Sequence, residues 1–211
     1  MYAGSLLRYT IKAVDWRPLA LAAVLLAGLG LSLDPFSGHP LPVRGWVEAL
    51  RISGVLLGAA AGFVLIDPLD DELGALPTPR WVRQAVRIGL AVSTSCLIWL
   101  AFYAITSWNV APGHDGYQGG VQLEAITCVV LGLAYAGTAL RYRAGTVAGL
   151  TGASALLATL IVSLFLREEA REYSPWVRPE QESWDLVHRW WIVALVAALA
   201  WLIAMSRQIR S

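Results

Sequence analysis

The residues best suited to an interaction with another protein lie in one short stretch between two apolar segments. Four carboxylates fall within six residues, and a Pro-Thr-Pro-Arg run follows them: Asp67, Asp70, Asp71 and Glu72, then Pro77, Thr78, Pro79 and Arg80. Thr78 can cap a helix that has Pro79 as its first residue, because its hydroxyl oxygen can accept a hydrogen bond from a backbone N–H group in the first turn of that helix. The pattern predicts a charged helix start that docks a partner. The alternative is a solvated loop that holds its acids away from lipid.

No other set of residues matches a catalytic signature. Gly152-Ala153-Ser154-Ala155 lacks the final glycine of a Gly-x-Ser-Gly intramembrane serine protease, and no histidine lies in a predicted span. Glu168 and Glu169 have the wrong spacing for an intramembrane metalloprotease, and the Asp-rich signature of phospholipid head-group transferases is missing. The chain also has no P-loop, so any ATP must bind to another subunit. The sequence therefore predicts a protein that is not an enzyme and carries no cofactor of its own.

The histidines and cysteines do not form a recognisable metal or redox site. His39, His114 and His188 fall in three separate predicted loops without ligand spacing, so solvated histidines are favoured over a metal site. Cys96 and Cys128 lie inside apolar stretches, where small buried hydrophobic side chains are favoured over a disulfide.

The elements that must position these residues are apolar and close to membrane-spanning length. The chain is 57% hydrophobic and 15% charged, with a mean hydropathy of +0.58, whereas soluble domains are about a quarter charged. A backbone in hydrocarbon must satisfy its own hydrogen bonds, so the sequence predicts an all-α integral membrane domain over residues 1–211. The predicted spans are Leu19–Leu33, Ala49–Ile66, Ile88–Trp108, Val121–Leu140, Gly145–Leu166 and Trp190–Met205.

Two further patterns concern how these spans assemble. Gly54, Gly58 and Gly62 form a small-xxx-small run in the second span, which favours close helix packing. The span interiors hold only Ser, Thr, Tyr and Trp as polar residues, with Asp67 ending the second span and Glu124 beginning the fourth. A proton relay or ion-coupled transporter normally needs acids or histidines near the membrane midplane, so this mechanism is disfavoured.

Residues 1–17 precede the first span and have the pattern of an amphipathic helix. Leu6, Leu7, Ile11 and Val14 share one helical face, whereas Arg8, Lys12 and Asp15 share another. We expect a helix that lies in the membrane interface, with a frayed polar terminus as the alternative.

The distribution of Lys and Arg predicts the orientation. With six spans, ten basic residues fall on the side of the termini and six on the other side, which favours cytoplasmic termini. The first group is Arg8, Lys12, Arg17, Arg80, Arg83, Arg87, Arg141, Arg143, Arg207 and Arg210, and the second is Arg44, Arg51, Arg167, Arg171, Arg178 and Arg189. Residues 67–87 are then a cytoplasmic connection and 167–189 an extracellular loop. The net charge of +1 disfavours a nucleic-acid partner.

Taken together, these features resemble the membrane subunit of a type-2 ABC exporter. The amphipathic first helix, six spans and long cytoplasmic connection between spans two and three match that family, and the 67–80 motif is similar to that of small actinobacterial six-helix permeases. The resemblance implies that Asp67, Asp70, Asp71, Glu72, Pro77, Thr78 and Arg80 contact an ATP-binding cassette subunit, which carries ATP and Mg. The charged 167–189 loop departs from the partly apolar hairpin that the family has there.

The resemblance implies a multi-pass permease of the cell (plasma) membrane, paired with a second copy or a paralogous membrane subunit. With no predicted charge in the bundle, the exported substrate is expected to be apolar or amphipathic, such as a drug, peptide or lipid-like molecule. The alternative is a non-catalytic scaffold or regulatory subunit of a larger membrane complex that docks through residues 167–189.

Overall fold

The computed structural model describes residues 10–33, 39–66, 80–142, 147–169 and 174–206. In these ranges the regular elements are helices, apart from one isolated bridge between Leu41 and Val110. The long helices are α2 (Arg17–Ser32), α3 (Val43–Ala61), α4 (Arg80–Thr106), α5 (Gln118–Tyr142), α6 (Val147–Glu169) and α7 (Trp184–Ser206). Short 3₁₀ helices are η1 (Gly62–Leu65), η3 (Ser107–Asn109) and η4 (Asp115–Tyr117).

Each predicted apolar stretch is helical, but several helices are longer than the stretch that predicted them. The α3 helix begins at Val43, directly after Pro42, and the α7 helix begins at Trp184. The predicted boundaries at Ala49 and Trp190 were therefore wrong by six residues. Hydropathy marks where lipid can cover a helix, whereas backbone hydrogen bonding continues through polar residues until a turn or proline interrupts it.

Five helices in the described ranges are long and apolar enough to cross a membrane, namely the segments that correspond to α3, α4, α5, α6 and α7. The α2 helix is apolar but has 16 residues, which gives about 24 Å at 1.5 Å per residue. A typical hydrocarbon core is about 30 Å thick. The described part is thus a helical bundle with five helices long and apolar enough to span a membrane, and α2 is the shortest of its apolar helices.

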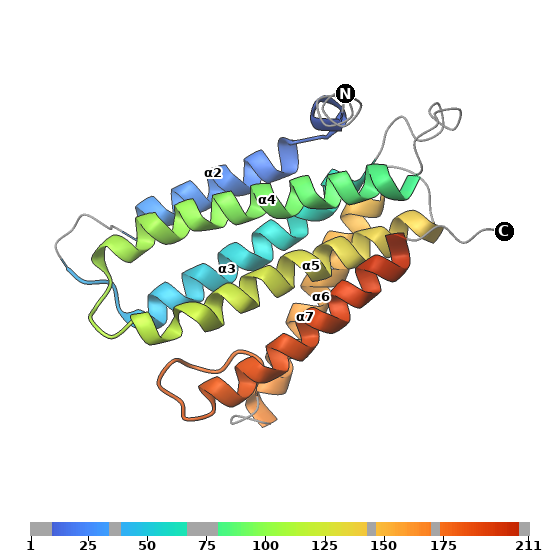
Figure 1. Ribbon diagram of the computed structural model, residues 1–211. Coiled ribbons are helices and arrows are strands. Elements are labelled where there is room, and N and C mark those ends of the chain that lie inside the picture. The colour runs from blue at the N-terminus through green and yellow to red at the C-terminus, as the bar shows by residue number, and fades with distance from the viewer. Residues whose placement is uncertain (1–9, 34–38, 67–79, 143–146, 170–173, 207–211) are drawn as a thin grey trace.

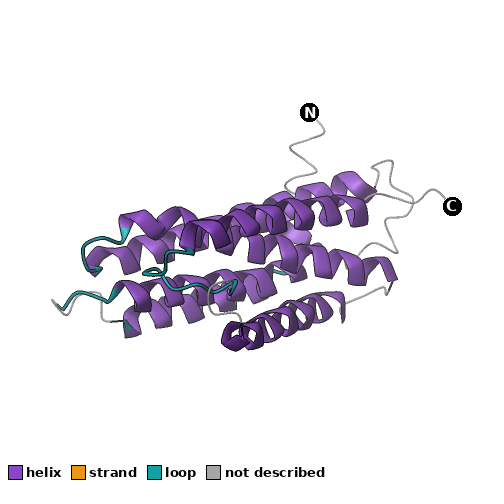
Figure 2. Cartoon of the chain, turned by 90° about the horizontal axis from the view of Figure 1, so that it is seen from below, coloured by secondary structure: helices purple, strands orange, loops and turns teal. Residues whose placement is uncertain are grey.

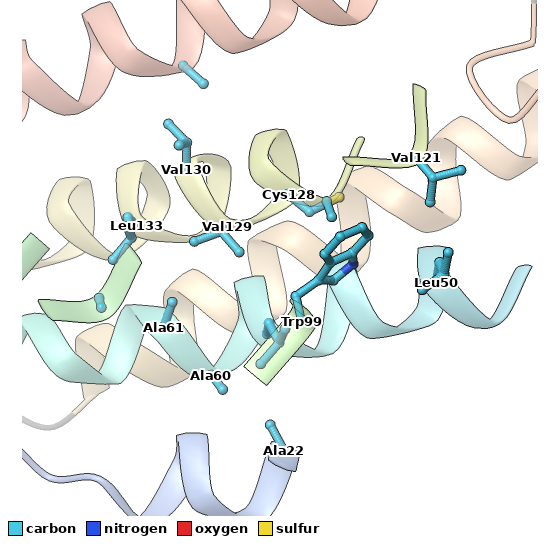
Figure 3. Close-up of a cluster of buried hydrophobic side chains, with 14 of the residues drawn as sticks. Ala22, Leu50, Ala60, Ala61, Trp99, Val121, Cys128, Val129, Val130 and Leu133 are labelled. Atoms are coloured by element: carbon cyan, nitrogen blue, oxygen red, sulfur yellow. The ribbon is translucent and has the colours of Figure 1, made fainter. Parts of the chain in front are cut away.

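The α5 helix is at the centre of the bundle and packs against α3, α6 and α7 (Figures 1 and 2). The start of α2 and the end of α7 lie at the same end of the bundle (Figure 1). Buried side chains of α5, including Val121, Cys128 and Leu133, meet α3, and the indole of Trp99 reaches toward them from α4 (Figure 3). This core fixes the three helices that carry the candidate site.

Glycines allow α3 and α5 to approach each other closely. A Cβ on Gly54 would lie 2.7 Å from the Cα of Ala125, and a Cβ on Gly58 would lie 2.5 Å from the carbonyl oxygen of Cys128. A Cβ on Gly62 would lie 3.0 Å from the Cβ of Ala136. Larger side chains at the first two positions would force the helices apart, since the nearest atoms belong to the α5 backbone.

The outer faces of α4, α6 and α7 carry exposed apolar side chains, as expected for contact with lipid or another membrane subunit. Examples are Leu97, Ile161, Phe165, Trp190 and Val196. Cys96 is on such a face, so the prediction that it is buried was wrong, whereas Cys128 is buried.

Part of the predicted N-terminal interfacial helix lies outside the described residues, which begin at residue 10. Residues 10–13 are helical. Trp16 then donates a hydrogen bond from its indole Nε1 to the carbonyl oxygen of Ile11 over 2.8 Å.

Candidate functional site

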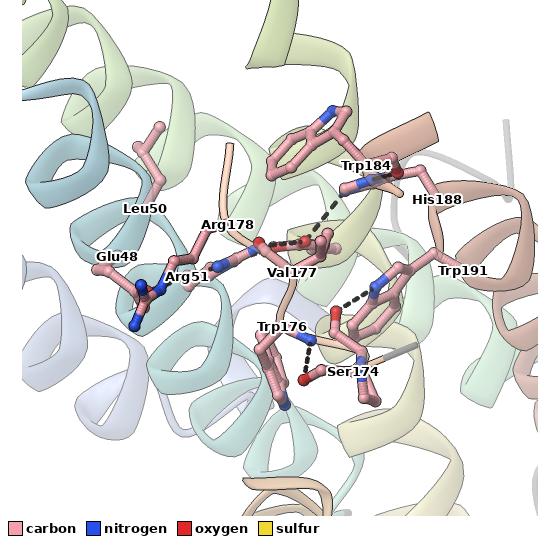
Figure 4. Close-up of polar contacts among 12 residues, drawn as sticks. Glu48, Leu50, Arg51, Ser174, Trp176, Val177, Arg178, Trp184, His188 and Trp191 are labelled. Atoms are coloured by element: carbon pink, nitrogen blue, oxygen red, sulfur yellow. Dashed lines mark hydrogen bonds and ion pairs between the residues drawn. The ribbon is translucent and has the colours of Figure 1, made fainter. Parts of the chain in front are cut away.

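Three ionisable side chains meet inside the bundle, at the end where α3, α5 and α7 begin. Figure 4 shows two of them, Arg51 and His188, beside the segment that carries Trp176 and Val177. Arg51, Glu124 and His188 come one from each helix and are 4%, 1% and 8% exposed. We call them the buried charge cluster. An ionisable group inside a membrane domain is costly to desolvate, so it marks a functional or strongly structural position.

Arg51 and Glu124 form a two-pronged ion pair. The Nε of Arg51 donates to Oε2 of Glu124 over 2.7 Å, and its Nη2 donates to Oε1 over 2.8 Å. The same Nη2 also donates to the main-chain carbonyl oxygen of Val177 over 2.8 Å. Because the guanidinium is planar and its partner is fully buried, this arrangement fixes the relative position of α3 and α5.

His188 completes the cluster from α7. Its Nε2 lies 3.0 Å from Oε1 of Glu124, and its Nδ1 lies 2.7 Å from the carbonyl oxygen of Trp184. Gly120 on α5 provides the space for the ring, because a Cβ there would lie 2.6 Å from Nε2. The imidazole is therefore held on both of its nitrogens and packed on one face.

One carboxylate and two tryptophan rings also lie close to the Arg51 guanidinium. Its Nη1 lies 3.6 Å from Oε1 of Glu48, whose side chain is 41% exposed. The Trp176 and Trp184 rings lie 5.6 and 5.7 Å from the guanidinium carbon. Aromatic faces stabilise a cation that has lost its water, and the Glu48 carboxylate adds a partly solvated counter-charge.

The segment of residues 174–183, which we call the docked segment, is held against this end of the bundle. Besides the bond from Arg51 to Val177, the Trp176 indole donates to Oγ of Ser163 over 2.7 Å, and the Trp191 indole donates to the Pro175 carbonyl over 3.0 Å. Ser174, Trp176 and Val177 are buried. The charge cluster thus joins three helices and the connection that leads into α7.

The cluster contradicts two predictions from the sequence. His188 was assigned to a polar loop, and the bundle interior was expected to hold no charge, although Arg51 falls within the predicted span Ala49–Ile66. His188 lies inside a helix because α7 begins at Trp184, before the predicted start of that span, and Arg51 is buried because α3 packs its side chain against Glu124 of α5. Arg51 and Glu124 are 73 residues apart, so no local spacing could indicate their contact.

The other two histidines differ from His188. His114 is half-buried, lies 3.2 Å from the Ala111 carbonyl through Nδ1, and packs edge-on against Trp46 at 5.3 Å. His39 is exposed. Within the described residues, no group of three His, Cys, Asp or Glu side chains could hold a metal ion.

A second buried arginine occupies the opposite end of the bundle. Arg87 on α4 is 4% exposed. Its Nη1 donates to the carbonyl oxygen of Val64 over 3.3 Å and to that of Ile66. These carbonyls lie just beyond the end of α3, so the arginine bonds this chain end and ties it to α4.

The residues predicted to contact an ATPase follow Ile66 directly. Asp67, Asp70, Asp71, Glu72, Pro77 and Thr78 lie outside the described residues. Arg80 is the first residue of α4, and its side chain is also outside the described part. The structure therefore shows where the connection leaves and re-enters the bundle, at a point fixed by Arg87.

Two apolar grooves run along the sides of α5. One, of about 450 Å³, lies between α6 and α7 and is lined by Leu131, Leu156 and Trp190, with Trp176 from the docked segment. The other, of about 290 Å³, lies beside α4 and is lined by Val92, Trp99, Ile126 and other residues. Such grooves suit acyl chains or other apolar groups.

Comparison with known protein families, with characterised proteins and with solved structures finds no significant match for this chain.

Proposed function

We propose that this chain is the membrane (permease) subunit of an ATP-driven ABC exporter of the plasma membrane. In this proposal all six apolar helices, α2 included, cross the bilayer, and both termini face the cytoplasm. A separate ATP-binding cassette subunit docks on residues 67–87 and supplies ATP and Mg. A second copy or a paralogous subunit completes the pathway.

The observation that carries the proposal is the base of the 67–79 connection. Arg87 joins the chain that enters the connection, at Val64 and Ile66, to the helix that leaves it. A partner that pulls on the connection would therefore move α3 and α4 as a unit. The acidic and Pro-Thr-Pro sequence of the connection supplies the partner chemistry, since its charges can bind a complementary groove.

The orientation is supported by a revised count of basic residues. Arg51 was counted among the six basic residues of the outer side, but it is buried in an ion pair. Arg87, in the group of ten, is buried to the same extent, so with both set aside five basic positions remain on the outer side against nine on the side of the termini. This strengthens the bias toward a cytoplasmic 67–87 connection.

The substrate class follows from the surfaces that a substrate would meet. Both grooves along α5 are apolar, and the buried charges at Arg51 and Glu124 already satisfy each other. An apolar or amphipathic molecule that moves between bilayer and protein fits these walls better than a polar solute does.

Copurification from native membranes tests the proposal. We expect a stoichiometric P-loop ATPase to accompany the tagged chain, and Asp70→Arg with Asp71→Arg to remove it while membrane insertion is retained. The matched control is Glu180→Arg with Glu182→Arg, two exposed acids of the docked segment, which should leave the ATPase bound. Unchanged copurification with the Asp70 and Asp71 variant would contradict the assigned docking site.

The second candidate is a scaffold subunit that docks through residues 167–189. One observation favours it: the docked segment buries its apolar side chains, whereas Arg178, Glu180, Glu182 and Asp185 stay exposed. The same pair of variants separates the candidates. Loss of a non-ATPase partner with the Glu180 and Glu182 variant would replace the exporter proposal with the scaffold.

A further inference from the structure

We infer that His188 and Glu124 form a proton-binding site, and that the bound proton keeps the docked segment closed over the end of the bundle. The inference rests on the geometry of the charge cluster and does not depend on the exporter proposal. Its chemistry is the reversible protonation of an imidazole that faces a buried carboxylate.

The first argument comes from the partners of the imidazole ring. The Trp184 carbonyl oxygen can only accept a hydrogen bond, so Nδ1 of His188 must carry a proton. On its other side Nε2 faces Oε1 of Glu124 at 3.0 Å. A bond there needs one further proton, either on Nε2 or on the carboxyl group.

The position of Arg51 decides where this proton is held. Both oxygens of Glu124 already accept N–H groups from the guanidinium, at 2.7 and 2.8 Å. A carboxylate that pairs with a guanidinium through both of its oxygens acts as a hydrogen-bond acceptor there. The proton is therefore on Nε2, and His188 is an imidazolium that makes two donated hydrogen bonds.

The second argument is charge balance. With His188 protonated, two cations, Arg51 and His188, face two carboxylates, Glu124 in the interior and Glu48 at its edge. The other titratable groups near the site are Cys128, one turn along α5, the exposed Asp185 on α7, and Tyr117, packed edge-on against Trp184 at 5.1 Å. With the partly exposed Glu48 carboxylate included, the protonated cluster carries no net charge.

Loss of the proton would leave a lone pair on Nε2 of His188 facing a lone pair on Oε1 of Glu124. The imidazole ring has no room to turn away. Nε2 and Oε1 of Glu124 would repel at 3.0 Å. The ring cannot move aside, because it packs against Gly120 and lies 4.2 Å from the ring of Trp184. The first two turns of α7 must therefore shift together. They include Trp191, which donates to the Pro175 carbonyl, so the docked segment would be released.

The sign of the pH dependence follows directly. Protonation adds a charge-assisted hydrogen bond in the closed state, so the docked segment is most firmly held at low pH and opens as pH rises. A charge-assisted bond of this kind is strong enough to change the open fraction about tenfold.

The protonation state can be measured on the intact protein in lipid nanodiscs. The chain has three histidines, so ¹⁵N-histidine labelling gives few ring signals, and a His188→Gln variant assigns those of His188. We expect both ring nitrogens of His188 to be protonated at low pH and one to lose its proton as pH rises. A neutral ring throughout would overturn the inference, as would a ring that stays doubly protonated at every pH.

Opening is measured by the reactivity of a cysteine at a buried position of the docked segment. Ser174 is 2% exposed, so Ser174→Cys, with Cys96 and Cys128 replaced by alanine, reports release of the segment to a water-soluble maleimide. Glu182→Cys, at an exposed position, is the control that cancels the pH dependence of the thiol itself. We expect the ratio of the two rates to rise about tenfold from low to high pH.

His188→Gln separates a proton site from a merely structural contact. Its amide can donate to Glu124 but does not titrate in this range. We expect the rate ratio in this variant to stay low and flat with pH. A wild-type ratio that does not change, or a variant that retains the wild-type pH dependence, would refute the inference.

Discussion

The two buried arginines, at opposite ends of the bundle, are equally inaccessible yet differ in what they hold. Arg51 and Arg87 are each 4% exposed. Arg51 binds a carboxylate 73 residues away and a carbonyl 126 residues away, whereas Arg87 binds carbonyls 21 and 23 residues away. One arginine joins distant helices, and the other closes the base of a single connection.

This difference separates global from local stabilisation. The Arg51 end depends on a buried charge that must stay paired, because an unpaired charge in a low-dielectric interior is very unfavourable. At the Arg87 end the guanidinium donates to the main-chain carbonyls of Val64 and Ile66, and the loss of a hydrogen bond to a carbonyl is less costly. We therefore expect changes at the first end to destabilise the whole bundle, and changes at the second to affect mainly the connection.

The largest effect is expected from removing Glu124 alone. Glu124→Leu leaves Arg51 buried without its carboxylate, and we expect the free energy of unfolding to fall by about 3–5 kcal/mol. Reversible unfolding in mixed micelles measures it. Glu124→Leu together with Arg51→Met should recover most of the loss, since an apolar pair can replace a buried ion pair. A double variant as unstable as the single one would show that the charge is not the cause.

Glu48 provides the matched control at the same end. Its side chain is 41% exposed and lies 3.6 Å from Arg51. Solvent screens such a pair, so Glu48→Gln should lower the unfolding free energy by less than about 1 kcal/mol. A loss as large as that of Glu124→Leu would mean that the outer carboxylate, and not the buried one, balances the arginine.

An intermediate effect is expected between the two ends, where α3 meets α5. Gly58→Ala places a Cβ 2.5 Å from the Cys128 carbonyl oxygen, and we expect a loss of about 1–3 kcal/mol from overpacking in the same unfolding assay. Gly89→Ala is the control, because a Cβ there meets nothing within 4 Å. Equal stability of the two variants would contradict the close approach of the helices.

An effect on stability similar to that of Gly58→Ala, but the largest effect on coupling, is expected at Arg87. Arg87→Gln should lower the unfolding free energy by about 1–3 kcal/mol, through the carbonyls of Val64 and Ile66 that it leaves without donors. If the exporter proposal holds, the ATPase should still copurify, but its stimulation by this subunit should fall.

Arg141 is the control for that experiment. It lies at the end of α5 and donates to the Ala204 carbonyl of α7 over 3.2 Å, whereas Arg87 donates to carbonyls at the base of the connection. Arg141→Gln should leave ATPase stimulation unchanged. Equal losses in both variants would indicate general loosening of this end and not a role for Arg87 at the base of the connection.

Local sequence was sufficient to predict the helical class and the approximate position of each apolar helix. Runs of apolar residues such as those around Leu26, Ile98 and Leu160 exclude water wherever they lie, so their helical structure follows from composition alone. The spacing of Gly54, Gly58 and Gly62 likewise marks one helical face, because four-residue intervals return to the same side of a helix.

The tertiary structure alone decided which polar residues become a site. In the sequence, Arg51, Glu124 and His188 are isolated polar residues near the ends of apolar stretches, where polar side chains usually meet water. They become one buried cluster because α3, α5 and α7 begin at the same end of the bundle and pack closely enough for the three side chains to touch. Pairing over 64 and 73 residues leaves no local periodicity to detect. It arises because a desolvated charge is stable only beside a partner, and only the packed bundle brings that partner within reach.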